Sequence, residues 1–416
     1  MTAPNGLYTI PAGAAFVDAL AAGVLAECSE PLALARYTIL LPTRRACRAL
    51  REGFLRVTGG RPLLLPRMQA IGDVEPDIAS FGEAPGLDAA DLPPAISEQR
   101  RLLLLARRIL EWNADPKAGR QAEMTPDHAV RLAGELARLI DRVQTERLSF
   151  DALQSLAPLE LARHWLLTLD FLQIVTRDWP AMLAEEGCLD PAERRNLLLR
   201  RLAERWSNEP SPGPVIAAGS TGSVPATADL FAVIAGLPQG RVVLPGLDRA
   251  ADAETWEAIR QDQTHPQYGM ARLLDRLGVT REEVREWPHA AFRHPTAEAR
   301  SALLAEALRP AETTDRWRAL GGFAATARTA LGADGASFTR VVCAGDKEEG
   351  EVIALLLRHA LETDGKTAAL VTPDRRLARR VAASLRRWDI DIDDSAGTPL
   401  DKTAPGVFFR QVAAVV

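Results

Sequence analysis

Short apolar runs alternate with amphipathic segments over the first part of the chain. Three short runs are mostly apolar: Leu7–Ile10, Tyr37–Leu41 and Pro62–Met68. A proline follows directly after each of the first two. Such runs are typical of strands buried on both faces of a sheet. Between them, Ala14–Cys28 has helical spacing, and a second helix runs from Thr43, which is suited to cap it, to about Arg56. This β-α-β-α-β order predicts a parallel sheet.

The pattern is helical throughout from Pro94 to about Trp206, which predicts an all-helical insertion. A linker-like segment rich in proline follows at Ser207–Pro214, and the sheet pattern then returns with a strand at Val215–Ala218 and a helix from Ala226. We therefore expect strands from both sides of the helical block to pair in one sheet.

Four regions follow from this pattern: the first part of an α/β domain at 1–92, the all-α insertion at 93–207, the return to the first domain with a helical segment at 208–333, and the start of a second α/β domain at 334–416. The last region is expected to contain the strands "FTRVVCAG" and "GKTAALVTP" around a helix. The chain stops inside the helical pattern "PGVFFRQVAAVV" without a cap, so we expect it to be a piece of a longer protein. Superfamily 1 helicase cores, with RecA-like parallel-sheet domains and helical insertions, are built in this way.

Composition narrows the class of protein. Of 416 residues, 47% are hydrophobic and 25% charged, which is typical of a globular protein. The formal net charge is −5, so any nucleic-acid binding must come from local basic patches. There is no signal-peptide pattern and no apolar run of about 18–20 residues. A cytoplasmic protein is expected, with no membrane partner, and its four separated cysteines have no metal-ligand spacing (Cys28, Cys47, Cys188 and Cys343).

The first strand-turn-helix has the layout of a phosphate-binding loop without its residues. Such a loop requires G-x-x-x-x-G-K-[ST] at the turn, so that backbone amides and a lysine hold the phosphates. The turn here has one glycine and no lysine, and consists of Pro11, Ala12, Gly13, Ala14, Ala15 and Phe16. Gly365-Lys366-Thr367 resembles the end of such a loop, but it precedes a predicted strand where a phosphate loop follows one.

The other parts of a nucleotide motor are also incomplete. No carboxylate follows the strand Val215–Ala218, where an acidic pair would hold Mg²⁺. Only the arginine expected from the second domain has candidates, Arg375 and Arg376. Two losses out of three argue against ATP hydrolysis in this chain. Ser220, Thr221 and Gly222 follow the strand and could form a small anion nest, although a turn that caps the helix from Ala226 is the simpler interpretation.

Several longer stretches resemble one family. They include "LLPTRRACRALREGFL", "LARHWLLTLDFLQIVTRDWP", "PVIAAGSTGSVPATADLFAVIAGLPQGRVVLPGLD", "HPQYGMARLL" and "DSAGTPLDKTAPG", and they extend over nearly the whole chain. The chain resembles the N-terminal part of the AddB family, the second subunit of bacterial AddAB helicase-nucleases, in its alphaproteobacterial form. The segments "AAGSTGSVPATADL" and "HPQYGM" are the most specific; the others taken singly are weak.

The resemblance implies a role in double-strand-break repair by homologous recombination. It implies a heterodimer in which an AddA-like partner supplies an active helicase and a nuclease. In the family, AddB carries a C-terminal PD-(D/E)XK nuclease with Mg²⁺ and an iron–sulfur cluster, which would lie beyond Val416; no cofactor is expected in this chain. Because some family members keep an intact phosphate loop, the turn from Pro11 to Phe16 is interpreted as a vestigial one.

Two groups of arginines are candidates for DNA contact, with single strands or duplex ends. Thr43, Arg44 and Arg45 follow a parallel strand at a helix N-terminus, and Arg48 lies one turn on, so that amides, a hydroxyl and guanidiniums can meet a phosphate. A capped helix with a solvated arginine face is the equally weighted alternative. The second group is the helix that begins with Arg375 and Arg376, which could equally be solvated or contact the partner.

Two further functional readings stay open at this point. The chain could be a protein-interaction scaffold that holds the AddA partner without contacting DNA, or, more weakly, a nucleotide hydrolase with a divergent loop. Salt-dependent binding of single-stranded DNA separates the first reading from the scaffold. An ATP-binding assay addresses the hydrolase. No catalytic residue is assigned.

Overall fold

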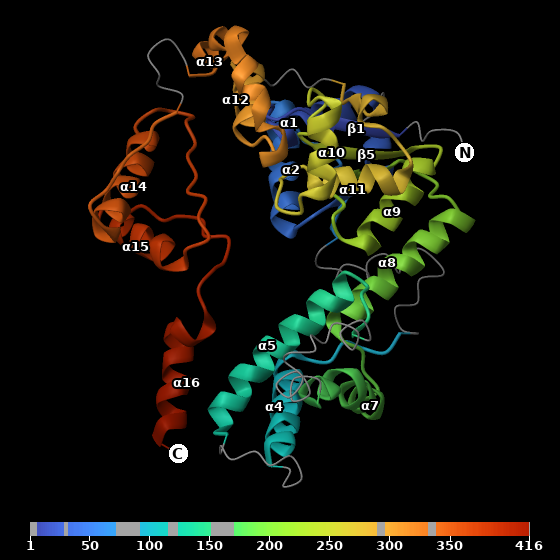
Figure 1. The fold of residues 1–416 in the computed structure, drawn as a ribbon, viewed down its shortest axis with the longest axis vertical. Helices are drawn as coiled ribbons and strands as arrows, with labels where there is room; N and C mark the ends of the chain where they lie inside the picture. The colour runs from blue at the N-terminus through green and yellow to red at the C-terminus, as the bar shows by residue number, and fades with distance from the viewer. Residues whose placement is uncertain are drawn as a thin grey trace. The chain divides into compact units, whose positions relative to one another are not determined.

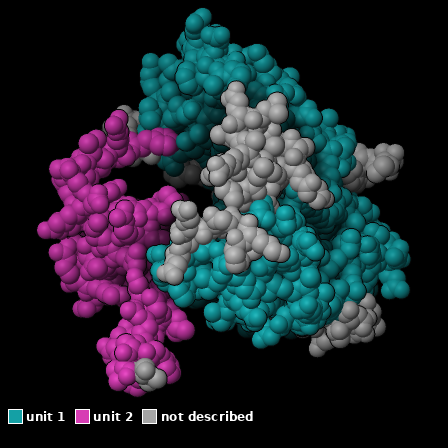
Figure 2. Space-filling view, turned by 60° about the horizontal axis from the view of Figure 1, so that its bottom comes forward, with its two compact units in different colours: residues 1–334 teal, residues 335–416 magenta. Residues whose placement is uncertain are grey.

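A computed structural model of the chain describes residues 6–28, 32–71, 92–114, 124–150, 170–288, 296–331 and 338–415. The chain divides into two compact units, Met1–Asp334 and Gly335–Val416, which Figure 2 shows in separate colours. Within the described ranges, no helix combines the length and the apolar character needed to span a membrane. The expected boundary at 333/334 lies outside the described residues, as do the parts of the predicted helical block at 115–123 and 151–169.

The first unit is built on a six-stranded sheet in which every pairing is parallel, in the order β3-β2-β4-β5-β1-β6. Its strands are β1 (Leu7–Ile10), β2 (Thr38–Leu41), β3 (Arg67–Ala70), β4 (Val215–Ala218), β5 (Gly240–Pro245) and β6 (Arg285–Glu286). An α/β fold with a parallel sheet is therefore confirmed, and it is consistent with Rossmann-like or RecA-like architecture.

The sheet is covered by helices on both faces (Figure 1). One face packs against α1 (Phe16–Glu27) and α2 (Arg44–Val57), the other against α8 (Pro191–Asn208), α9 (Pro225–Gly236) and α11 (Tyr268–Leu277). Neighbouring residues of one strand enter opposite cores: Leu40 joins the second group of helices, while Ile39 and Leu41 join the first. Burial on both faces explains why the central strands β2 and β4 consist mostly of apolar residues.

The strand β3, at one edge of the sheet, is shorter than the sequence predicted and begins at a later residue. The apolar run Pro62–Met68 was expected to be the strand, but β3 is Arg67–Ala70. Proline has no backbone N–H to donate, so Pro62 and Pro66 cannot take part as donors in a ladder. Regular pairing begins where the amide of Arg67 donates to the carbonyl of Tyr37 at 2.9 Å.

The helical block lies in sequence between two neighbouring strands of the sheet. Thr38 of β2 pairs with Val215 of β4, so strands from before and after the block are joined, as the sequence predicted. The described helical elements of the block are α4 (Glu98–Ala114), α5 (Pro126–Thr145), a π-helical turn (Ile174–Asp178), α7 (Trp179–Glu186) and α8. They form a core of their own around Leu105, Leu136 and Trp179. Helix α8 contacts both α5 and α9, and thereby connects the block to the sheet domain.

The rest of the first unit is mostly helical, as the pattern predicted. It contains α10 (Ala253–Gln261), α12 (Ala297–Ala307), a 3₁₀ segment (Ala311–Gly322) and α13 (Ala324–Leu331). The side chain of Asp252 caps α10 by accepting from the amide of Thr255 at 2.9 Å.

The second unit differs from the expected β-α-β arrangement. It contains α14 (Asp346–Leu361), α15 (Arg375–Arg386) and α16 (Ala404–Val415), with a small core around Ala354, Val381 and Leu385. The segments expected to be strands are not strands over residues 338–345 and 365–373. A strand needs a ladder partner, whereas Val342 and Val371 are 79% and 93% exposed. The Val-rich pattern indicates segments that are suited to form strands, but it does not supply the neighbouring strand with which they would pair.

Candidate functional site

The carboxyl ends of β2 and β4 form a topological switch point. These two strands are neighbours, but the chain leaves β2 into α2 on one face of the sheet and leaves β4 into α9 on the other. Open α/β sheets bind ligands where neighbouring connections diverge in this way. The loops at this point are Pro42–Thr43 and Gly219–Ser220. They lie close together, because a Cβ placed on Gly219 would lie 3.7 Å from Cδ of Pro42.

Thr43 begins α2 at this switch point. Its backbone is extended, with φ −143° and ψ 160°, and its Oγ1 accepts a hydrogen bond from the amide of Ala46 at 3.1 Å. The N-cap predicted from the sequence is therefore confirmed. Arg44 and Arg45 occupy the first helical turn and are exposed. A helix N-terminus with its amide dipole and two arginines side by side favours an anion.

The basic character continues along the exposed face of α2. The helix contains five arginines and one acidic residue, Glu52, in a chain whose net charge is −5. Arg44, Arg48 and Arg51 follow each other at spacings of four and three residues, so they share one face. Arg48 forms an exposed ion pair with Glu52 at 3.3 Å, and Arg56 binds Asp18 on α1 at 2.6 Å. Exposed pairs of this kind are weak, so a phosphate can compete for Arg48.

The predicted vestigial phosphate loop is a tight turn after β1. The amide of Ala14 donates to the carbonyl of Pro11 at 3.2 Å, and Gly13 has φ +85°, which together form a β-turn of the type that requires glycine at its third position. Ala15, at the N-cap of α1, supplies no side-chain hydrogen bond, and Phe16 begins the helix. A phosphate loop needs a wider ring of inward-facing amides.

Neighbouring residues occupy the space at this turn. A Cβ on Gly13 would lie 2.9 Å from Cβ of Ala297, at the start of α12. Ser301, one turn further along α12, donates to the carbonyl of Ala12 at 3.2 Å. On the β5 side, a Cβ on Gly246 would lie 3.2 Å from that of Ala12. Residues of α12 and of the loop after β5 therefore pack directly against the turn that follows β1.

The predicted anion nest at Ser220, Thr221 and Gly222 contains an internal hydrogen bond. The amide of Gly222 donates to Oγ of Ser220 at 3.2 Å, so the hydroxyl and the amide satisfy each other. Gly222 is buried against Leu273 of α11, where a Cβ would lie 2.7 Å from a Leu273 methyl carbon. The alternative was a turn that caps the following helix, but α9 begins at Pro225 and has no side-chain cap.

In the second unit, the contacts of the arginine-rich helix α15 are largely internal. Arg375 binds both carboxylate oxygens of Asp394, at 2.9 and 2.6 Å, and this hydrogen bonding raises the pKa of Arg375. Arg376 follows Asp374, whose side chain accepts from the Arg376 amide at 2.7 Å. Arg380 donates to the carbonyl of Asp346 on α14 at 2.8 Å. Because its guanidinium binds both oxygens of Asp394, Arg375 stabilises the second unit itself.

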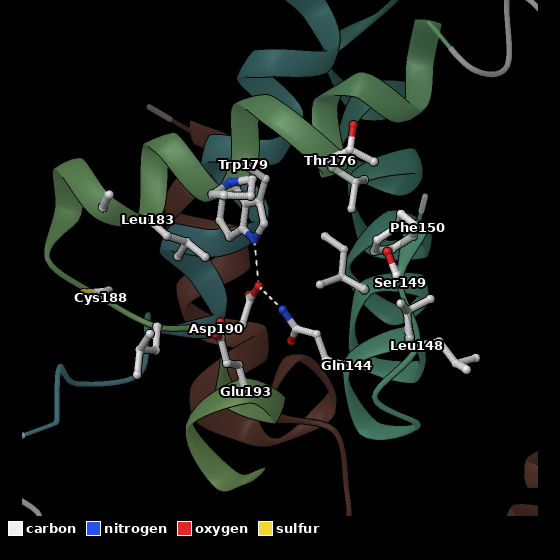
Figure 3. A pocket seen from close by; sticks show the side chains of 16 residues that line it. Gln144, Leu148, Ser149, Phe150, Thr176, Trp179, Leu183, Cys188, Asp190 and Glu193 are labelled. Carbon is white, nitrogen blue, oxygen red and sulfur yellow. Dashed lines mark hydrogen bonds between the residues drawn. The ribbon is translucent and has the colours of Figure 1, made fainter. Parts of the chain in front are cut away.

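Sequence reasoning missed a polar centre inside the helical block, beside a cavity of about 550 Å³ (Figure 3). Asp190, which is fully buried, accepts hydrogen bonds from Nε1 of Trp179 at 2.8 Å and from Nε2 of Gln144 at 2.9 Å. Its other oxygen forms an ion pair at 2.9 Å with Nε of Arg101, which is 6% exposed, without hydrogen-bond geometry. These contacts tie α4, α5, α7 and the start of α8 together.

The centre also changes the chemistry of Glu193, which lines the same cavity. Partial burial raises the pKa of Glu193, and the negative charge of Asp190 raises it further. The one sequence signal was Asp190-Pro191, which reads as a helix start. Asp190 does stand at the N-cap of α8, yet its side chain makes no capping bond, because its oxygens face the buried donors instead. Within the described residues, no group of His, Cys, Asp and Glu is arranged to hold a metal ion.

Comparison with known proteins does not assign the chain to a family. It matches no protein-family model, and no curated protein matches it at a significant level. The fold and the site define an α/β protein with a parallel sheet, a basic helix N-terminus at one switch point, and a tight turn after β1 that packs against α12.

Proposed function

We propose that this chain is a helicase-like, DNA-handling subunit of an AddAB-type helicase-nuclease that processes double-strand breaks, and that its own first α/β unit does not hydrolyse ATP. In this proposal an AddA-like partner supplies the motor activity. The observation that carries the proposal is the N-terminus of α2: Thr43 caps it, Arg44 and Arg45 are exposed on its first turn, and it lies at the β2/β4 switch point.

The chemistry of this site suits a sugar–phosphate backbone. Guanidinium groups bind phosphate through two parallel hydrogen bonds, and the helix N-terminus adds about 0.3–1 kcal/mol for an anion. Neither interaction reads a base, so the site is expected to bind single strands without sequence preference. The turn between Pro11 and Phe16, closed by Ala297, supports the absence of ATP chemistry.

The test measures how a labelled oligothymidine strand binds to the whole chain at a series of salt concentrations, with fluorescence anisotropy as the readout. The logarithm of the affinity should fall linearly with the logarithm of the salt concentration, with a slope of about −0.7 for each phosphate contact. An affinity that is undetectable at low salt, or that does not change with salt, would contradict the proposal.

The exposed apolar side chains of the second unit favour a second candidate, a scaffold that binds the partner protein and not DNA. Phe408 and Phe409 of α16 are 62% and 69% exposed, and Leu356 of α14 is 57% exposed. Exposed apolar groups of this kind are typical of protein interfaces. Stable association with an AddA-like subunit in size-exclusion chromatography, combined with no DNA binding in the anisotropy series, would select this candidate.

A further inference from the structure

A second cavity lies at the edge of the sheet opposite to the α2 N-terminus. It has a volume of about 330 Å³ and is lined by residues at the amino ends of β2 and β3, by the segment that leads into β4, and by the end of α8. Because the strands are parallel, their amino ends meet at one edge, and the switch point at Thr43 lies at the other. The cavity is therefore a separate place from the proposed DNA site.

Three arginines from three different elements line this cavity. Arg36 ends a 3₁₀ turn (Ala33–Arg36), Arg67 begins β3, and Arg205 lies in the last turns of α8. The hydroxyl-bearing residues Thr38 and Ser211 line it as well. Among the described lining residues the only carboxylate is Glu209. The lining thus carries a net positive charge and many hydrogen-bond donors, in a chain that is acidic as a whole.

The walls of the cavity are constrained by close packing. Gly213 approaches the backbone so closely that a Cβ there would lie 2.3 Å from the carbonyl oxygen of Arg36. Pro210 and Pro212 restrict the same linker, and the buried side chains of Leu202 and Trp206 line the cavity from α8. A linker that is restricted in this way holds the rim in place, so a ligand would not have to order it first.

We propose that this cavity binds a phosphate or phosphate-ester group. Arginine is suited to this because its planar fork binds phosphate oxygens in pairs, and three forks from separate elements can surround one group. A phosphate held by Arg36, Arg67 and Arg205 would connect the helical block, through α8, to the strands on which the sheet is built. The proposal does not depend on the DNA-handling role.

The experiment is calorimetric titration of the whole chain with pyrophosphate, with a nucleoside monophosphate and with oligothymidine. Saturable binding of pyrophosphate or the monophosphate indicates a small phosphorylated ligand. Binding of the oligonucleotide alone indicates a phosphodiester backbone. Arg205→Gln should weaken whichever probe binds by at least about tenfold, on the scale of one lost charge-assisted hydrogen bond. Arg200→Gln is the matched control, because Arg200 lies on the same helix, is 60% exposed and is not a lining residue.

A second variant lies outside α8, so that the test does not depend on whether Arg205→Gln disturbs the folding of this helix. Ser211→Asp places a negative charge in the linker at the rim, away from the sheet, and should abolish binding of the same probe. Absence of binding by all three probes at millimolar concentration would overturn the proposal, as would equal affinities of the Arg200 and Arg205 variants. If the oligonucleotide is the one probe that binds, and an Arg44→Ala/Arg45→Ala variant loses this binding while Arg205→Gln does not, the cavity proposal fails and the DNA proposal stands.

Discussion

Gly13 and Ala297 come together at the turn that follows the first strand, although they are far apart in the sequence. A Cβ on Gly13 would lie only 2.9 Å from the Cβ of Ala297, which is 4% exposed. Real Cβ atoms essentially never approach this closely, and Gly13 also has φ +85°. The turn therefore packs closely against α12, at the position in the chain where a phosphate loop would contact a nucleotide.

This fit predicts that Gly13→Ala lowers the free energy of unfolding by more than a backbone effect alone. A residue other than glycine with positive φ costs about 1–2 kcal/mol, and overpacking against Ala297 should add about 1–3 kcal/mol. Gly59→Ala is the matched control, since Gly59 has φ +63° with no atom within 4 Å of the added Cβ. Urea titration of both variants measures the difference, and equal losses would mean that Ala297 is not in contact.

The same turn leads us to expect no binding of Mg-ATP to this chain. The lysine is missing, the Ala14 amide is already bonded to Pro11, and Ser301 of α12 binds Ala12. Calorimetry of the whole chain with Mg-ATP should give no heat of binding in the micromolar range. A micromolar dissociation constant would contradict the proposal of an ATPase-inactive unit.

For DNA, we expect Arg44 and Arg45 to contribute more than the arginines of α15. Replacing Arg44 and Arg45 by alanine should weaken single-strand binding and flatten its salt dependence by about one to two units, because about one contact is lost for each residue. Arg379→Ala/Arg380→Ala is the comparison, since these arginines donate to the carbonyls of Arg375 and Asp346 within their own unit. Anisotropy over a salt series measures both slopes.

If the α15 variant weakens DNA binding more than the Arg44/Arg45 variant does, the main DNA contact lies in the second unit. The proposal of a DNA site at the β2/β4 switch point would then be wrong. A reduced affinity for an AddA-like partner, with DNA binding intact, would instead assign α15 to the protein interface that the sequence left open.

The first unit could be predicted from the sequence because its signals are local. The run Tyr37–Leu41 is apolar since both its faces are buried, and Thr43 caps a helix through an atom three residues away. The second unit could not be predicted in this way. Val342 and Val371 have the residue type of a strand, but pairing depends on a neighbour that local sequence does not specify.

The contacts that the sequence did not indicate join distant residues. Gly13 meets Ala297, and Asp190 meets Arg101, Gln144 and Trp179, and none of these pairs has a local pattern. At the predicted nest, the Gly222 amide donates to the Ser220 hydroxyl two residues away, so an anion there would have to compete with this hydroxyl for the amide.

Asp190 should be among the residues of the helical block whose substitution costs most. Asp190→Asn removes a fully buried charge that lies 2.9 Å from Arg101, and breaking a buried pair typically costs about 3–5 kcal/mol. Asp141→Asn is the matched control: Asp141 binds the same arginine at 2.8 Å but is 43% exposed, so we expect a loss below about 1 kcal/mol. Urea denaturation measures both, and similar losses would show that burial of Asp190 is not what makes it important.

Asp252 provides a prediction for the dependence of stability on pH. Burial by itself would raise its pKa, but the hydrogen bonds from the amide and hydroxyl of Thr255 and from Arg309, with the charge of Arg316, lower the pKa well below its ordinary value. A lowered folded-state pKa means that the stabilisation is complete above the unfolded-state pKa of about 3.9 and is lost as the pH falls towards the folded-state value.

We therefore expect Asp252→Asn to reduce the free energy of unfolding at pH 7 by about 0.5–2 kcal/mol, the range for loss of a helix cap, because Asp252 caps α10. The difference from the unchanged protein should stay constant from pH 7 to about pH 5 and shrink below about pH 4, because the carboxylate then becomes protonated in the unfolded chain while it stays charged in the folded protein. Asp315→Asn is the control, because Asp315 is 85% exposed and its pair with Arg318 is 3.5 Å long, so its substitution should have almost no effect at any pH. Denaturant titrations between pH 3 and pH 7 give both differences. A gap that widens as the pH falls would mean that the carboxylate of Asp252 is not held in its charged form by Thr255 and Arg309.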